Sequence, residues 1–196
     1  MKGLQCLLGS ANACRKPRDH ARAGSVASIY LISEQLLPAM REAWEDGYFL
    51  EDVSGLDTLE GFEVVYHLDH WEQPGRLTLR IVVPHDKPEA PSVASIFPAA
   101  DWHERETFDM YGIVFTGHPG LKPLLLPEDS NIHPLLKEPA DRVSIYHLFP
   151  DYDIIDCRPQ FLKDAKPPAP QDKPRKAGPA ETGPDKPGKA DKTEDA

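Results

Sequence analysis

Two stretches of this chain combine β-branched and aromatic residues with alternating apolar and polar positions. They are residues 62–68 (FEVVYHL) and 77–83 (LTLRIVV), with Gln73-Pro74-Gly75 between them. This pattern predicts two strands joined as a β-hairpin. In the first strand, one face holds Phe62, Val64, Tyr66 and Leu68, and the other holds Glu63, Val65, His67 and Asp69. We therefore expect one face to be buried and the other to lie nearer to water.

Before the hairpin, apolar residues recur at steps of three and four, which is typical of a helix packed on one side. They are Leu36, Leu37, Met40, Ala43 and Trp44. Ser33 is the expected N-cap of this helix, and Gly47 is expected to end it. The apolar run over 48–53 then predicts a short strand that stops at the following Ser-Gly pair.

After the hairpin, Pro91 is expected to open a second helical stretch. We expect a short helical piece over 92–97, a break at Pro98, and a longer helix over 99–111. Gly112 supplies the end of that helix, because glycine readily adopts the left-handed conformation found there.

Composition divides the chain into four parts. Residues 10–28 are rich in basic and small residues and show no hydrophobic period. We therefore predict that residues 1–28 form a loosely ordered N-terminal arm. Residues 29–116, including one more expected strand at 113–115, form the folded part. Its expected class is α/β (α+β), a small mixed sheet flanked by two helices. Residues 117–162 are expected to form an extended wrapping arm, because proline blocks both helix and central strand at 119, 123, 127, 134 and 139.

The last part, residues 163–196, is rich in Pro, Lys and Asp and has no large apolar residue. It cannot bury enough apolar surface to offset the entropy of ordering, so we expect a disordered tail. This tail holds 8 basic and 7 acidic residues, which leaves a net charge of −11 on residues 1–162. An acidic body is repelled by phosphate backbones, so the composition argues against a nucleic-acid partner.

The apolar runs and the cysteines also narrow the class of protein. Apolar runs such as 81–83 and 124–126 are far shorter than the roughly 20 residues that cross a bilayer. The beginning of the chain has too few consecutive apolar residues for an export signal. The three cysteines, Cys6, Cys14 and Cys157, share no CxxC spacing, which favours a reducing compartment over a metal or disulfide framework.

The densest charged group lies in the second helix and consists of His103, Glu104, Arg105, Glu106 and Asp109. Three carboxylates within six residues could serve a metal or acid–base site. However, an HExxH motif is not completed, and neither a glycine-rich phosphate loop nor GxSxG occurs. A helix whose charges pair with one another or with a partner is therefore favoured, and we predict no catalytic, cofactor-binding or metal-binding residue. An independent metalloenzyme centred on His103, Glu104, Glu106 and Asp109 is the remote alternative.

The spacing of charged residues in this second helix indicates which of them could form ion pairs. Arg105 and Asp109 are four residues apart and can form a local ion pair. Glu106 and Asp109 share a helix face with Trp102 and Ile113. If that face is buried, its carboxylates need cationic or N–H partners, because an unpaired buried charge costs several kcal/mol.

Two His-Pro steps follow the helix, at His118-Pro119 and His133-Pro134. Proline disfavours the helical conformation for the residue before it, so both histidines are expected in extended backbone. The steps lie 15 residues apart without a carboxylate or cysteine at ligand spacing, which makes a metal site there a poor interpretation.

Several of these motifs resemble one known family. They are residues 104–113 (ERETFDMYGI), Phe115, 117–119 (GHP), 121–122 (LK) and 125–129 (LLPED), with 66–68 (YHL), 76–83, 91–93 (PSV) and 99–102 (AADW) upstream. Together they resemble the family of the 30 kDa, or C-type, subunit of respiratory complex I (NADH:quinone oxidoreductase), with relatives in membrane-bound hydrogenases. The resemblance spans about residues 30–140.

This resemblance implies an accessory peripheral-arm subunit of a proton-translocating NADH–quinone oxidoreductase, on the cytoplasmic face of the bacterial inner (plasma) membrane. The domain would brace the D-type large subunit, which bears the quinone site, and the arm would wrap over it. The chain would carry no cofactor, FMN and iron–sulfur clusters would lie in other subunits, and the membrane would be reached only through the complex. The family motif or partner interface would comprise Trp102, Glu104, Arg105, Glu106, Asp109, Gly112, Gly117, His118, Pro119, Lys122, His133, Pro134 and Lys137.

The chain departs from the family pattern at two positions. The family usually has two arginines after the Gly-His-Pro-x-Leu step, where this chain has Lys122-Pro123. It usually reads His-Pro-Leu-Arg-Lys-Asp, where this chain has Leu136, Lys137 and Glu138 after the same first three residues. An equivalent subunit of a complex fed by hydrogen or ferredoxin is therefore the first alternative.

Overall fold

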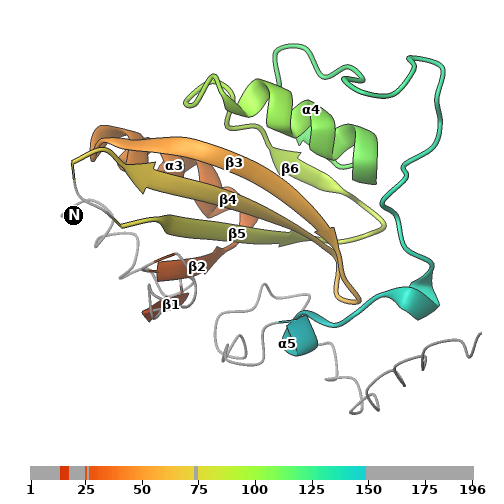
Figure 1. Cartoon of the computed structure of the whole chain (residues 1–196), viewed down its shortest axis with the longest axis horizontal. Helices are drawn as coiled ribbons and strands as arrows, with labels where there is room; N and C mark the ends of the chain where they lie inside the picture. The colour runs from red at the N-terminus through yellow and green to blue at the C-terminus, as the bar shows by residue number, and fades with distance from the viewer. Residues whose placement is uncertain (1–13, 18–24, 26, 73–74, 149–196) are drawn as a thin grey trace, which may run out of the picture.

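The computed structural model describes residues 14–17, 25, 27–72 and 75–148. Its main element is a five-stranded sheet of order β1-β2-β5-β4-β3 (Figure 1). The strands are β1 (Cys14–Pro17), β2 (Ala27–Leu31), β3 (Tyr48–Asp57), β4 (Phe62–His70) and β5 (Leu77–Val83). Strands β2 and β5 are parallel and the other neighbours are antiparallel. The predicted mixed sheet and its β4–β5 hairpin are thus confirmed.

Two helices cover the sheet, α3 (Ser33–Glu45) and α4 (Ala100–Tyr111). Helix α3 packs through its apolar stripe, in which Leu36, Ala39, Met40 and Ala43 are buried. Helix α4 lies across the edge strand β3 (Figure 1). The close approach depends on Gly55, since a Cβ there would lie 2.7 Å from the ring of Tyr111. The predicted flanking helices are confirmed.

A second, two-stranded sheet lies beside the main one. Strand β6 (Glu89–Pro91) pairs in parallel with β7 (Val114–Thr116), which follows α4 directly. Strand β7 was predicted from the sequence but β6 was not, because three residues ending in proline carry no strand pattern. Residues 94–96 after β6 form turns rather than the expected short helix, with the N–H of Phe97 donating to the carbonyl of Val93.

Strand β4 shows where the expected alternation holds and where it does not. Phe62, Val64, Tyr66 and Leu68 are all buried, as expected. On the other face His67 and Asp69 are half-buried, but Glu63 and Val65 are fully buried. Glu63 is bound there by the guanidinium of Arg80 at 2.7 Å and by the hydroxyl of Tyr30 at 3.0 Å. The expectation of a wetter second face is therefore wrong for the first half of the strand.

Element bounds also differ from prediction elsewhere. Strand β3 continues past Ser54 and Gly55 to Asp57, because its pairing with β4 runs through both residues. Ser33 is the first residue of α3, and Ile32 occupies the N-cap position without a side-chain hydrogen bond. Residues Cys14–Pro17, which the sequence analysis assigned to the N-terminal arm, form β1 at the edge of the sheet.

The arm follows β7 and agrees with the predicted extended, proline-rich segment as far as residue 148. It passes α4 and then runs down beside the sheet to the β3–β4 turn (Figure 1). Its only regular pieces among the described residues are a 3-10 turn, Pro139–Asp141, and the short helix α5 (Ile145–Leu148). The remainder of the predicted arm and the predicted tail, residues 149–196, lie outside the described residues.

Candidate functional site

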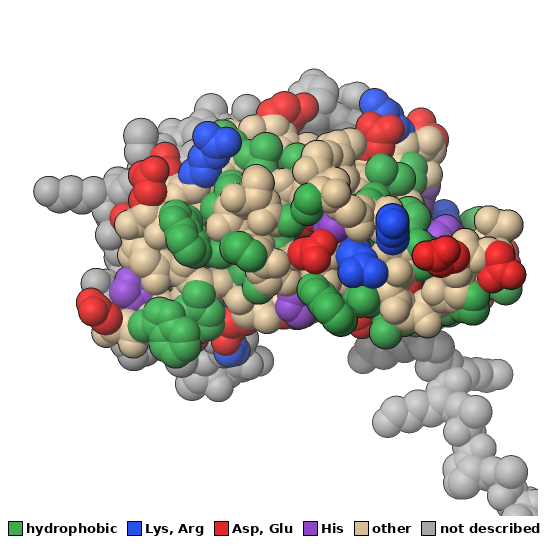
Figure 2. All heavy atoms as spheres, turned by 90° about the horizontal axis from the view of Figure 1, so that it is seen from above, with side chains coloured by type: hydrophobic (Ala, Val, Ile, Leu, Met, Phe, Trp, Pro, Cys, Tyr) green, Lys and Arg blue, Asp and Glu red, His purple; other side chains and the backbone are tan. Residues whose placement is uncertain are grey.

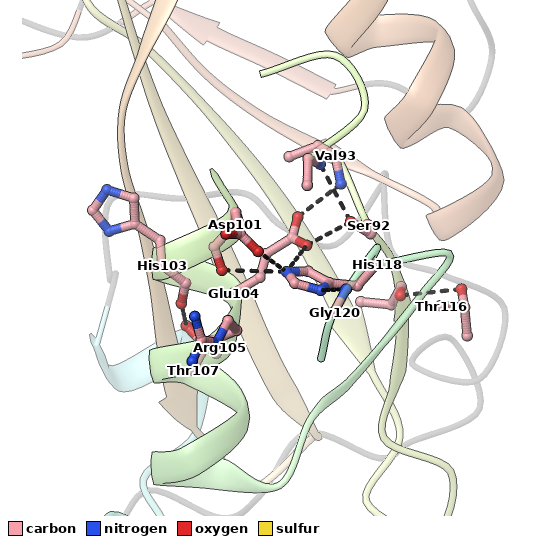
Figure 3. A network of polar contacts seen from close by, with 12 residues as sticks. Ser92, Val93, Asp101, His103, Glu104, Arg105, Thr107, Thr116, His118 and Gly120 are labelled. Atoms are coloured by element: carbon pink, nitrogen blue, oxygen red, sulfur yellow. Dashed lines mark hydrogen bonds and ion pairs between the residues drawn. The ribbon is translucent and has the colours of Figure 1, made fainter. Parts of the chain in front are cut away.

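Helix α4 makes polar contacts with the turn after β6 and with the arm. The first group of these contacts is centred on Glu104 (Figure 3). The Glu104 side chain is fully buried. The Ser92 hydroxyl donates to its Oε2 at 2.6 Å, and the backbone N–H of Val93 donates to its Oε1 at 2.7 Å. Burial raises the pKa of Glu104 above its ordinary value, while these hydrogen bonds and the nearby His118 oppose the rise. Glu104 therefore ties α4 to the turn after β6.

His118 fixes the beginning of the arm to the first turns of α4 (Figure 3). Its buried ring places Nε2 2.9 Å from Oδ1 of Asp101 and 3.9 Å from Oε2 of Glu104. The backbone N–H of Gly120 donates to Nδ1 at 3.0 Å. Because Nδ1 accepts a hydrogen bond, the ring proton of the neutral imidazole lies on Nε2 and is donated to Asp101.

Asp109 holds the next part of the arm. The backbone N–H groups of Leu124, Leu125 and Leu126 all donate to its Oδ2, at 2.8, 2.7 and 3.1 Å. Burial alone raises the pKa of Asp109, but the three N–H donors and the positive charge of Arg105 outweigh it. The pKa of this carboxyl consequently lies below its ordinary value, and the charged form is the one that the arm binds.

Arg105 also binds the arm, through backbone carbonyls. Its Nε and Nη2 donate to the carbonyl oxygens of Lys122 and Pro123, each at 3.0 Å. The guanidinium lies 5.8 Å from the ring centre of the exposed Trp102. Arg105 and Asp109, which the sequence allows to form a local ion pair, each bind the arm, and the positive charge of Arg105 still lowers the pKa of Asp109.

The C-terminal end of α4 meets His133. Gly112 caps the helix with φ +75°, and a Cβ at this position would lie 2.9 Å from Nε2 of His133. Nδ1 of His133 lies 2.8 Å from the carbonyl oxygen of Asp109. Both His-Pro histidines thus bind backbone or carboxylate groups of α4.

A second anchoring carboxylate, Asp57 at the end of β3, was missed by the sequence analysis. It is 1% exposed, and its Oδ1 lies 2.8 Å from Nε2 of His85 and 3.0 Å from Nε of Arg142. Its Oδ2 accepts the backbone N–H of Lys137 at 2.9 Å. These partners are 28 to 85 residues away in the chain, so no local pattern marks Asp57 as an anchor.

Glu60, in the adjacent β3–β4 turn, was also missed. It accepts the hydroxyl of Ser144 and, at 2.9 Å, the backbone N–H of Ile145. A single bridge between Thr58 and Val143 lies beside these contacts. Asp57 and Glu60 together hold the far end of the described arm on the sheet.

The predicted site residues fall into two groups. The structure joins Glu104 with His118, Arg105 with Lys122, and Asp109 and Gly112 with His133. The face that Trp102 and Glu106 share with Asp109 and Ile113 is buried only in part: Asp109 and Ile113 are buried, whereas Trp102 and Glu106 are exposed. Helix α4 also buries Glu104 and Thr107. Among the predicted site residues, those exposed on the arm are Gly117, Pro119, Lys122, Pro134 and Lys137.

The described residues also bear on metal binding and on crossing a membrane. Among the residues that the structure describes, no three His, Cys, Asp or Glu side chains are grouped so that they could hold a metal ion. Within the same residues, no helix combines the length and apolar character that crossing a membrane requires.

Comparison with known proteins identifies the family. Residues 29–142 match the family described as the 30 kDa subunit of the respiratory-chain NADH dehydrogenase. The C-type subunit of NADH-quinone oxidoreductase from Roseiflexus sp. (strain RS-1) is 42% identical over 145 residues, which cover 70% of this chain and 83% of that protein. Its counterpart from Herpetosiphon aurantiacus is 44% identical over 115 residues, covering 55% and 67%. The chain therefore belongs to the family of the 30 kDa, or C-type, subunit of NADH-quinone oxidoreductase.

Solved structures agree with this assignment. A trypsin-resistant fragment of Nqo5 superimposes with a TM-score of 0.51 at 31% identity, covering 60% of this chain and 98% of the fragment. A chain of a membrane-bound sulfane sulfur reductase, an archaeal respiratory membrane complex, gives a TM-score of 0.59 at 22% identity, covering 80% and 93%. The second likeness establishes the shared fold alone.

Proposed function

We propose that this chain is a cofactor-free accessory subunit of a proton-translocating NADH–quinone oxidoreductase. It braces the large subunit that bears the quinone site while electrons pass from NADH to quinone. FMN and the iron–sulfur clusters belong to other subunits. The complex holds the chain at the cytoplasmic face of the bacterial inner membrane, and the chain itself contributes no catalytic group.

The observation that carries this proposal is the way the arm is held. Asp57 and Asp109 are buried carboxylates, and each accepts backbone N–H groups of the arm. These contacts fix the arm in one position, yet four of its large apolar side chains are exposed. The exposed fractions are 62% for Leu125, 69% for Ile132, 48% for Leu135 and 43% for Leu136.

An ordered segment that displays apolar side chains is typical of a protein–protein interface. The face seen in Figure 2, which carries α4 and the upper part of the arm, shows hydrophobic side chains alternating with acidic and basic ones. Fixing the arm before association also lowers the entropy lost on binding. The surface formed by α4 and the arm, here called the arm surface, is thus suited to binding another subunit.

The chemistry of the polar residues supports an accessory role. Glu104, Asp109 and Asp57 each accept hydrogen bonds from this chain's own backbone. A general acid or base must instead reach the reacting atoms of a substrate. These carboxylates are occupied in holding the fold and the arm together.

Purification from native membranes tests the proposal. An affinity tag on the chain, followed by mild detergent extraction and mass spectrometry, should recover the D-type large subunit together with flavin-bearing NADH-oxidising subunits. NADH-dependent quinone reduction in the eluate is the matching activity. Recovery of a nickel–iron hydrogenase or a ferredoxin-oxidising subunit would select the first alternative, to which the departures at Pro123 and Leu136 lend weight. Recovery of the chain without any respiratory subunit would overturn the proposal.

A further inference from the structure

A small cleft lies where β3, α4 and the arm meet. Its volume is about 240 Å³, and its lining includes Gly55, Met110 and Leu135. Asp52 from the edge strand and Glu106 from the helix also line it. The cleft thus combines apolar side chains with two carboxylates, and Leu135 connects it to the arm surface.

The two carboxylates differ in what they bind within this chain. Asp52 accepts the hydroxyl of Ser54, and its Oδ1 lies 3.3 Å from Nδ1 of His103. The Glu106 side chain is exposed and makes no hydrogen bond or ion pair with the residues that the structure describes. Within the cleft, the Asp52 carboxylate is therefore already held by this chain, whereas the Glu106 carboxylate is available to a partner.

We propose that this cleft receives an arginine side chain of the neighbouring subunit. The inference rests on the proposed function, because it assumes that the arm surface faces another protein. An arginine fits the cleft in two respects. Its methylene groups can contact Met110 and Leu135, and its planar guanidinium has donors pointing in several directions, enough for both Asp52 and Glu106.

Charge complementarity favours an arginine of another protein over a second copy of this chain or a lysine side chain. The chain carries a formal net charge of −10, so two copies of it would repel each other. A lysine ammonium is a compact, strongly hydrated point charge and matches two separated carboxylates less well than a guanidinium does.

The test uses the native complex and a charge reversal at Glu106. Glu106→Arg and Glu106→Gln are introduced into the tagged full chain, and the complex is washed on the affinity resin with increasing NaCl. At the highest salt that the wild-type complex withstands, Glu106→Arg should reduce the retained partner by about tenfold, with Glu106→Gln in between. Asp86→Asn, at an exposed turn before β6, is the matched control and should behave like wild type.

A photo-cross-linking residue at position 106 then identifies the partner segment by mass spectrometry. The segment should contain an arginine, and exchanging it for glutamate should restore salt resistance when it is combined with Glu106→Arg. If the wild-type complex is recovered but Glu106→Arg resists salt equally well, the cleft assignment is wrong and the proposed function stands. If the wild-type chain brings no respiratory subunit with it, the proposed function fails first.

Discussion

At the residue scale, three buried carboxylates of this protein accept backbone N–H groups of distant segments. Asp109 accepts three from the arm, Glu104 one from the turn after β6, and Asp57 one from the arm. A buried carboxylate is costly unless such donors surround it. With them it fixes the position of a segment that has little regular structure of its own.

Replacing Asp109 by Asn should loosen the arm. The change removes the charge that three N–H groups bind, so the free energy of unfolding should fall by about 1–3 kcal/mol at pH 7. The pKa of Asp109 in the folded protein lies below its unfolded value, so its stabilisation is present above the unfolded pKa and is lost as the pH falls through the folded pKa. Urea unfolding between pH 3 and 7 should therefore show a flatter pH dependence for Asp109→Asn. An equally steep dependence would contradict this account.

The contribution of Glu104 to the pH dependence of stability should have the opposite sign to that of Asp109. Because burial raises its folded pKa, the folded state binds the proton more tightly and wild-type stability falls as the pH rises from the unfolded to the folded pKa. Glu104→Gln keeps an acceptor for Val93 without the charge, so at pH 7 its stability should lie within about 1 kcal/mol of wild type.

Glu104→Ala is the control for this substitution. It leaves the Ser92 hydroxyl and the Val93 N–H without their partner and should cost about 1–3 kcal/mol at the same pH. Thermal unfolding of the three proteins from pH 5 to 8 provides the measurement. A loss for Glu104→Gln as large as that for Glu104→Ala would show that the charge itself is required.

At the element scale, the end of α4 is defined by one glycine. Gly112→Ala places a Cβ in the left-handed region and 2.9 Å from the ring of His133. We expect a loss of about 1–2 kcal/mol in the free energy of unfolding. Gly120→Ala is the matched control, since a Cβ there meets nothing within 4 Å, and urea denaturation should find it close to wild type. Equal effects at the two positions would argue against a capping role.

Some of these elements could be predicted from the sequence and others could not. Strand β5 and most of α4 follow from local composition, and their observed bounds agree closely with prediction. Which face of α4 is buried does not follow from periodicity, because Glu104 is favoured in the interior only by donors from Ser92 and Val93. Strand β6 is too short to carry a pattern, and its partner β7 lies beyond α4. Long-range hydrogen bonding decided each of these cases.

At the scale of the whole molecule, the departures from the family at Pro123 and Leu136 predict a changed partner. A carboxylate left buried opposite a lost arginine would cost about 3–5 kcal/mol. We therefore expect neutral or apolar partner residues opposite these two positions and acidic ones near the exposed Lys122 and Lys137. Pro123→Arg and Leu136→Arg, singly and together, should leave co-purification with the native partner unchanged or weaker. Stronger binding would mean that the acidic partners are still present.

The tail gives a second prediction at this scale. Residues 163–196 contain no large apolar side chain with which to anchor themselves, so they are expected to be dispensable. Deleting residues 165–196 should leave the melting temperature and the amount of assembled complex unchanged within error. Loss of assembly with an unchanged melting temperature would identify the tail as a binding segment.

The anchoring of the arm at Asp57 also sets an order of events during synthesis. Its partner Arg142 is 85 residues further along the chain. At about 5–20 residues per second, Arg142 is added about 4–17 seconds after Asp57. The ribosome therefore delivers every strand of the main sheet before the segment that closes over its edge. A nascent chain passes through an interval in which the sheet is complete while the place of the arm is still open to chaperones or to another protein of the complex that arrives early.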